Sequence, residues 1–129
     1  MMEHEMTYPK MPTRLDNAEQ IMAWLRLLQA DGQSFAEEVS AQVAAGTLTE
    51  EISSSYLDKF TWLMAATDKA YAAVEEGDLD PNVAKIIATA ADASHDLGNG
   101  MTQLLFDRLR QDGANADLLL REAQDRHYT

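Results

Sequence analysis

The residues best suited to metal chemistry are Asp92 and His95, which lie three positions apart in Asp92-Ala93-Ser94-His95. On a helix this spacing puts a carboxylate and an imidazole on one face, where both could bind the same metal ion. Carboxylate-bridged di-metal bundles, however, use Glu-x-x-His on two helices and two further carboxylates. Only one such pair is present, with Asp in place of Glu, and both residues point away from the apolar stripe of their helix. We therefore predict a solvated polar face and no metal site.

A second acidic segment, Asp78-Leu79-Asp80-Pro81-Asn82, begins like a calcium-binding loop, with oxygen ligands at its first, third and fifth positions. Such a loop also needs glycine at the sixth position and glutamate at the twelfth. These positions hold Val83 and Thr89. The segment is therefore predicted to start a helix, with Asp80 as its N-cap and Pro81 in its first turn.

Near the C-terminus, Arg121 and His127 are separated by five residues and followed by Tyr128. This spacing resembles the Arg-x(4–6)-His signature of HEPN-type helical ribonucleases, in which the two residues act on the RNA phosphate. The resemblance covers seven residues, and Glu122 departs from the neutral polar residue that usually follows the arginine. It implies a ribonuclease as a second alternative function.

No other residues have catalytic spacing. The chain has no cysteine, which excludes disulfides, thiolate metal sites and cysteine nucleophiles. It also lacks a P-loop, a dinucleotide-binding fingerprint, Gly-x-Ser-x-Gly and His-Glu-x-x-His. We therefore predict a protein that is not an enzyme, with no catalytic residue, no cofactor and no small-molecule substrate.

The chain is strongly acidic, with 10 basic and 22 acidic residues and a net charge of −12. The two halves carry equal negative charge, and no basic cluster offers a footprint for nucleic acid. The acidity is interpreted first as solubility through solvated helix faces and alternatively as mimicry of a polyanion. No apolar run approaches the ~20 residues of a membrane span, and the first residues lack the basic start of a signal peptide. We expect a soluble cytoplasmic protein, or a virion-associated one if a phage encodes it.

The fold is predicted to be all-α, a single-domain antiparallel bundle over residues 16–129 with an extended N-terminal arm over residues 1–15. Capping residues such as Asp16 and Thr47, and glycines that follow periodic segments, such as Gly32, divide the domain into about five helices. Their ranges are about 17–31, 34–45, 48–76, 81–112 and 115–126.

Apolar stripes predict that helices 48–76 and 81–112 pack as an antiparallel hairpin. The stripe of the latter comprises Val83, Ile87, Ala90, Ser94, Leu97, Met101 and Leu105. Four large residues, Leu27, Leu57, Trp62 and Met64, lie off the stripes of their helices. Either helix 48–76 is central and buried on two sides, or these residues anchor a protein interface.

Gly98-Asn99-Gly100 interrupts helix 81–112 with residues of poor helix propensity. The apolar phase nevertheless continues through this segment, which favours an unbroken helix about 48 Å long. The alternative is a turn at Asn99 that closes a more compact bundle.

The predicted function is a non-enzymatic protein–protein interaction module, a structural subunit or adaptor of a larger, possibly phage, or homo-oligomeric assembly. Its partner would be another protein or a second copy, with no direct nucleic-acid binding and no membrane. The candidate interface residues are Met6, Met11, Leu27, Leu57, Trp62, Met64, Gly98 and Gly100. The alternative is an acidic inhibitor from a mobile element that blocks a basic, nucleic-acid-binding protein.

Overall fold

The computed structural model describes residues 8–128. This part of the chain is all-α, as predicted, and contains no strand. Its helices are α1 (Ala18–Ala45), α2 (Glu50–Glu76), α3 (Pro81–Gln111) and α4 (Ala116–His127). The described residues therefore form four helices, and the prediction of about five was wrong by one.

The extra helix in the prediction came from Gly32, which was expected to end a helix in a left-handed conformation. Among the described residues, only Gly46 and Gly113 have positive φ. Helix α1, which is 28 residues long, continues through Gly32 without a break. A Cβ at Gly32 would lie 2.9 Å from Leu63 Cδ2 and 3.2 Å from Leu97 Cδ2. Glycine stands at this position because α2 and α3 pack closely against α1, and not because the chain turns.

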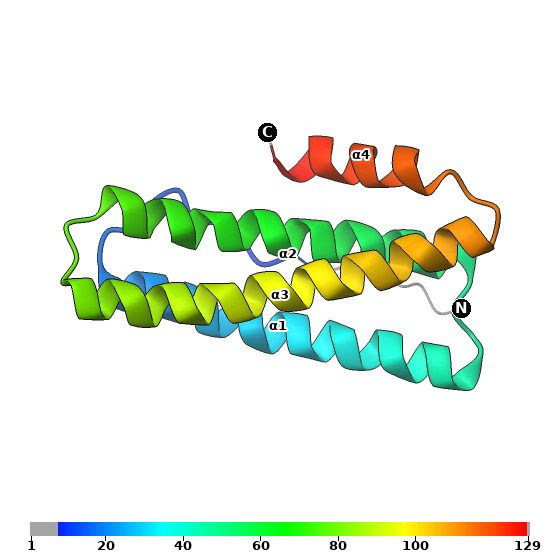
Figure 1. Ribbon diagram of the computed structural model, residues 1–129, viewed down its shortest axis with the longest axis horizontal. Coiled ribbons are helices and arrows are strands. Elements are labelled where there is room, and N and C mark those ends of the chain that lie inside the picture. Colours follow the sequence, from blue (N-terminus) through cyan, green and yellow to red (C-terminus); the bar gives the residue numbers. More distant parts are fainter. Residues whose placement is uncertain (1–7, 129) are drawn as a thin grey trace.

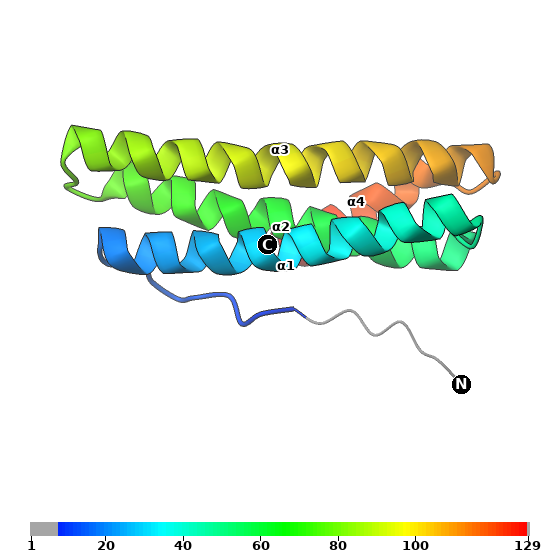
Figure 2. The same ribbon diagram turned by 90° about the horizontal axis from the view of Figure 1, so that it is seen from below.

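The three long helices lie side by side along the length of the molecule, and α4 packs against α2 and α3 (Figure 1). Among the described helices, α2 contacts all three others, and its most extensive contact is with α3. The described part of the N-terminal arm, residues 8–15, runs back along α1 (Figure 2), and the Tyr8 ring contacts Trp62 of α2. The helix α2 is therefore enclosed by α1, α3, α4 and the arm.

This enclosure explains two of the off-stripe residues. Leu57 and Trp62 are buried, with 1% and 4% of their surface exposed. The Trp62 ring contacts the ring of Trp24 at 6.3 Å between centroids and the ring of Tyr8 at 5.5 Å. For these two residues, the structure shows a central helix that is buried on more than one side. In the described fold, neither side chain is open to a partner.

Helix α3 is continuous through Gly98-Asn99-Gly100, so the interpretation of an unbroken helix is confirmed. Its buried face differs from the predicted stripe, since Leu97 and Met101 are only half-buried. Small residues allow α3 to approach α2 closely, and the hydroxyls of Thr67 and Ser94 lie 3.0 Å apart across this contact. The buried residues of α3 are Ile87, Ala91, Ser94, Gly98, Thr102, Leu105 and Leu109.

The helix starts follow the predicted chemistry with small shifts along the chain. Asp80 is the N-cap of α3, as predicted, and its carboxylate accepts from the N–H of Asn82. Asn17 and Thr49 cap α1 and α2, one and two residues after the caps expected at Asp16 and Thr47. Side-chain oxygens at these positions accept hydrogen bonds from backbone N–H groups that lack a partner within the helix.

Candidate functional site

The predicted polar pair on α3 lies beside a tyrosine of α2. The Tyr71 hydroxyl donates to the Asp92 carboxylate, and the His95 ring lies 6.4 Å from the Tyr71 ring in an edge-on arrangement. Burial raises the pKa of Tyr71, and the charges of Asp92, Asp96 and Asp68 raise it further. Among residues 8–128, no group of three or more acidic or histidine side chains is placed to hold a metal ion.

His127 belongs to a cluster centred on Asp58 of α2. Its Nε2 lies 3.0 Å from Asp58 Oδ2, and Arg126 donates to Asp58 Oδ1 from Nε at 2.9 Å and from Nη2 at 2.6 Å. The Tyr8 hydroxyl also donates to Asp58 Oδ2. Arg121, the residue predicted from the ribonuclease signature, is exposed elsewhere on α4. The ribonuclease hypothesis stays a prediction.

The electrostatics of this cluster stabilise the charged form of Asp58. Burial alone would raise the pKa of its carboxyl, but hydrogen bonds from Tyr8, His127 and Arg126 outweigh burial and lower it. Burial is the largest cause of the raised pKa of Tyr8, and the hydrogen bond to Asp58 and the charge of that carboxylate raise it further against the opposing charge of Arg126. With both carboxylate oxygens engaged, Asp58 joins the N-terminal arm and the end of α4 to α2.

The next residue of α2, Lys59, is a buried cation. Its side chain is 1% exposed, and Nζ lies 2.6 Å from Asp31 Oδ2 of α1. The rings of Phe35, Trp62 and Tyr8 surround Nζ, with their centroids at 4.5, 4.6 and 4.9 Å. Burial lowers the pKa of Lys59, against the opposing effect of Asp31. This pair was not predicted from the sequence, although a lone lysine among large residues of a central helix signals a need for an acidic partner.

The remaining candidate interface residues fall into different environments. Leu27 is 43% exposed on α1 and lies beside the arm in a shallow depression. Met64 and Met11 are half-buried, while Met6 lies outside the described residues. Gly98 is buried and Gly100 is exposed.

Gly100 belongs to an uncharged surface that we call the outer stripe of α3. Apart from the consecutive Gly100 and Met101, its members recur every three or four residues and follow one face of the helix, adjacent to the buried face. Ile86 is 63% exposed, Leu104 42% and Val83 36%, and no charged residue interrupts the series. The outer stripe comprises Val83, Ile86, Ala90, Ala93, Leu97, Gly100, Met101 and Leu104.

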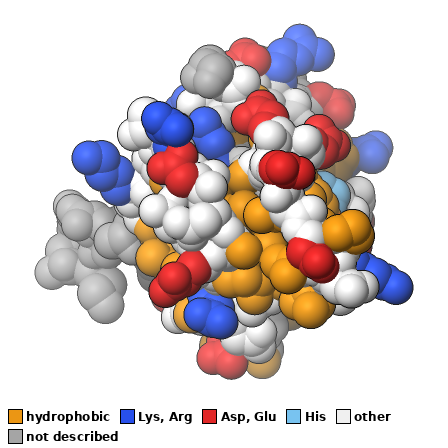
Figure 3. Space-filling view, turned by 90° about the vertical axis from the view of Figure 1, so that its left-hand side faces the viewer, with side chains coloured by type: hydrophobic (Ala, Val, Ile, Leu, Met, Phe, Trp, Pro, Cys, Tyr) orange, Lys and Arg blue, Asp and Glu red, His pale blue; other side chains and the backbone are white. Residues whose placement is uncertain are grey.

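Large apolar side chains of the outer stripe lie at both ends of α3. Figure 3 looks onto the end of the bundle where α2 passes into α3, and hydrophobic side chains gather there in one patch framed by charged ones. Val83 and Ile86 are in the first two turns of α3 at this end. A contiguous exposed apolar surface is a common mark of an interaction site.

The charge of α3 sets it apart from the rest of the protein. Residues 81–111 contain three basic residues, Lys85, Arg108 and Arg110, and three acidic residues. The acidic residues are Asp92, Asp96 and Asp107. Since α3 is neutral overall, the net charge of −12 lies entirely on the remainder of the chain.

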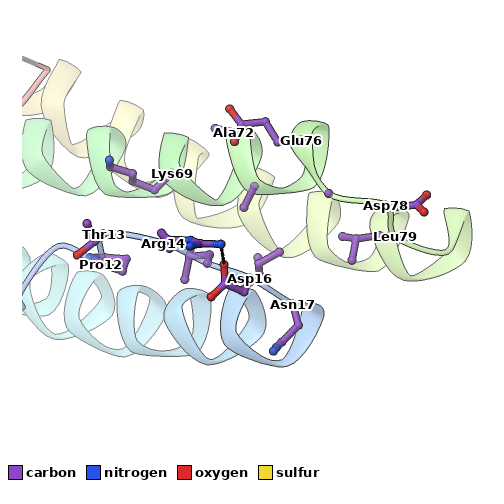
Figure 4. Close-up of a pocket in the computed structure, with 14 residues that line it drawn as sticks. Pro12, Thr13, Arg14, Asp16, Asn17, Lys69, Ala72, Glu76, Asp78 and Leu79 are labelled. Atoms are coloured by element: carbon purple, nitrogen blue, oxygen red, sulfur yellow. Dashed lines mark ion pairs between the residues drawn. The ribbon is translucent and has the colours of Figure 1, made fainter.

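A cavity of about 690 Å³ lies between the arm, the start of α1 and the end of α2 (Figure 4). Its rim carries both signs of charge, from Lys69 and Glu76 among others, and Arg14 pairs with Asp16 at 2.9 Å. None of its lining residues has a buried side-chain oxygen or nitrogen that lacks a partner. These side chains converge on no common point, so the cavity offers no definite chemistry.

No family model, curated protein or solved structure matches this chain. Within the described residues, no helix is both long enough and apolar enough to cross a membrane.

Proposed function

We propose that this chain is a non-enzymatic protein-interaction module that binds its partner through the outer stripe of α3. The observation that carries the proposal is an uncharged apolar stripe on the neutral helix of a protein with a net charge of −12. The exposed side chains of Val83, Ile86 and Leu104 have no internal role comparable to that of the buried face. Burial of such residues is a main source of binding free energy between proteins.

The polar clusters on α2 support the same conclusion, because their groups bind one another within the chain. Asp58, Tyr8, Arg126 and His127 bind one another, and Lys59 is enclosed by rings and Asp31. These groups join separate segments of the chain to α2. They accordingly hold the scaffold that presents α3, which suits a structural subunit or an adaptor of a larger assembly.

The test compares proteins captured from the native host by the full chain and by two variants. Ile86→Gln alters the outer stripe, and Leu118→Gln is a matched control because Leu118 is 48% exposed on α4. We expect specific partners to be captured by the wild type and the control and lost with Ile86→Gln. Partners that are retained by Ile86→Gln and lost with Leu118→Gln would contradict the proposal.

A second candidate function is an acidic inhibitor of a basic, nucleic-acid-binding protein, favoured by the concentration of the −12 charge outside α3. Binding through that charge should weaken steeply as salt rises, whereas binding through the outer stripe should change little. Partner affinity measured over a salt series therefore distinguishes the two functions.

A further inference from the structure

We propose that the outer stripe of α3 binds a second copy of this chain, with the two α3 helices antiparallel about a two-fold axis near Ala93. The inference rests on the proposed function, because it takes the outer stripe as the binding surface and names its partner. The order of large and small residues along the stripe, the charge of α3 and the open space around Gly100 support this arrangement.

The order of residue sizes makes the stripe complementary to its own reverse. A two-fold axis at Ala93 places residues opposite each other when their numbers sum to about 186, so Ala93 faces its own copy. Ile86 then faces Gly100, so a large residue meets a small one on both sides of the axis, as knobs and holes do in packed helix pairs. Val83 faces Leu104 at the outer level, where two exposed apolar side chains meet. Leu97 takes no part in this match, because its side chain lies against Gly32 of α1.

Ile86 and Gly100 form the sharpest of these matches. Ile86 is the most exposed large hydrophobic residue among those described, at 63%. Around a Cβ built at Gly100, no atom lies within 4 Å. The glycine therefore has open space outside the helix, into which an isoleucine side chain from a second copy fits. The two-fold axis makes this contact twice.

A parallel arrangement lacks this match. It would place Ile86 against Ile86 and Gly100 against Gly100, so that side chains collide at one level and leave a gap at the other. It would also align the two helix dipoles, whereas the antiparallel arrangement opposes them. The sizes and the dipoles both favour the antiparallel pair.

Among the helices, α3 is the one at which a second copy meets the least electrostatic repulsion. Two molecules of net charge −12 repel each other, and the repulsion is smallest where the contacting element is neutral. Helix α1 adjoins the stripe at its middle, where the Gln29 amide donates to the Ala90 carbonyl at 3.5 Å. The contact is built mainly on one helix, and stable interfaces bury about 800 Å² per partner. We therefore expect a dissociation constant in the micromolar range.

The test is sedimentation equilibrium of the full chain from about 1 to about 500 µM, a range that brackets the expected dissociation constant. Gly100→Leu fills the space for Ile86 and should weaken dimerisation at least about tenfold. Asn99→Leu is the matched control, because Asn99 is the exposed neighbour on another face of α3, and it should leave the dimer unchanged. Circular dichroism checks that both variants keep the helix content of the wild type.

A compensating variant makes the result specific to the two positions. Ile86→Ala combined with Gly100→Leu moves the large residue to the other side of the same contact, so dimerisation should recover at least in part. A dimer that is indifferent to Gly100→Leu would overturn the inference, because another face must then form it. A chain that stays monomeric over the whole range would also overturn it. In that second case the proposed function still stands if Ile86→Gln abolishes capture of a different protein, and it fails if no partner depends on the stripe.

Discussion

Two glycines that lie two positions apart in α3 occupy opposite environments. A Cβ at Gly98 would lie 2.8 Å from Met64 Cγ and 3.5 Å from the Phe60 carbonyl, whereas one at Gly100 would meet no atom within 4 Å. Glycine in a helix interior costs about 1 kcal/mol relative to alanine. At Gly98 the close approach of α2 and α3 offsets that cost. At Gly100 nothing inside the described fold does, whereas the proposed contact with a second copy would.

The two sides of α3 also differ in whether their side chains have contacts within the described fold. On the inner side, the Thr67 and Ser94 hydroxyls bind each other, and Leu105 is fully buried. On the outer side, apolar side chains are exposed without a partner in the described fold. The inner side therefore determines stability, and the outer side is free to determine association. Substitutions at single positions test this division between stability and association.

Removal of the buried cation should have the largest effect. Lys59→Met keeps the length of the side chain but leaves Asp31 without its counter-charge inside the bundle. The free energy of unfolding should fall by about 3–5 kcal/mol in urea denaturation. The double variant Lys59→Met with Asp31→Asn should recover part of the loss, because no uncompensated charge remains. A loss below about 1 kcal/mol in the single variant would contradict a buried, enclosed pair.

Gly98→Ala should come next, because its added methyl group collides with Met64 and approaches the Phe60 backbone. The free energy of unfolding should fall by about 1–3 kcal/mol, as expected for overpacking. Thermal denaturation at a concentration well below the dimer dissociation constant measures this effect on the monomer alone. An equally stable or more stable variant would show that the inner face is not closely packed.

The Asp58 cluster should make stability depend on acid pH. The folded-state pKa of Asp58 is lowered below its usual value of 3.8, so the unfolded state takes up the proton first as the pH falls. The stabilisation is present above the unfolded-state pKa and is lost as the pH falls through the folded-state pKa. Asp58→Asn should cost about 1–2 kcal/mol near neutral pH and remove this part of the acid dependence. Urea denaturation at several pH values measures it, with Asp125→Asn on the exposed side of α4 as the control. Unchanged pH dependence in Asp58→Asn would exclude the cluster as its source.

Much of the architecture could be predicted, because helix starts and short turns depend on residues that are close together in the sequence. The Asp80 cap and the α2–α3 hairpin are local features of this kind. Gly32 misled the prediction, since a glycine after a periodic segment signals a helix end equally well when it serves close packing. Which face of α3 is buried was also ambiguous in the sequence. Leu97 and Met101 lie between two apolar stripes, and the small Gly98 allows one of these stripes to face α2.

The polar clusters could not be predicted from local patterns. Tyr8, Asp58 and His127 are far apart in the sequence, and only the packing of the arm and α4 against α2 brings them together. Trp62 appears displaced from its stripe for the same reason, because the arm covers a face of α2 that a two-helix hairpin would leave exposed. Long-range arrangement of this kind leaves no periodic signal in the sequence.

Gly100→Ala should have the smallest effect on stability and the opposite sign from Gly98→Ala. With open space around the position, the substitution removes only the backbone cost of glycine, and the free energy of unfolding should rise by up to about 1 kcal/mol. The same variant should weaken self-association, since the methyl group narrows the space for Ile86. Destabilisation by Gly100→Ala at low protein concentration would contradict the assignment of this residue to the outer side.

The central claim, that the outer stripe of α3 pairs with its own copy, is tested most directly by a cysteine placed on the two-fold axis. The chain has no cysteine, so Ala93→Cys introduces a single thiol, and Ala72→Cys on the exposed side of α2 is the matched control. A disulfide forms readily only when the two Cβ atoms come within about 4.5 Å. Under mild oxidation, Ala93→Cys should give a covalent dimer rapidly and nearly completely, and adding Gly100→Leu should suppress it to the level of the control. Cross-linking of Ala93→Cys that is no faster than that of Ala72→Cys would contradict the account.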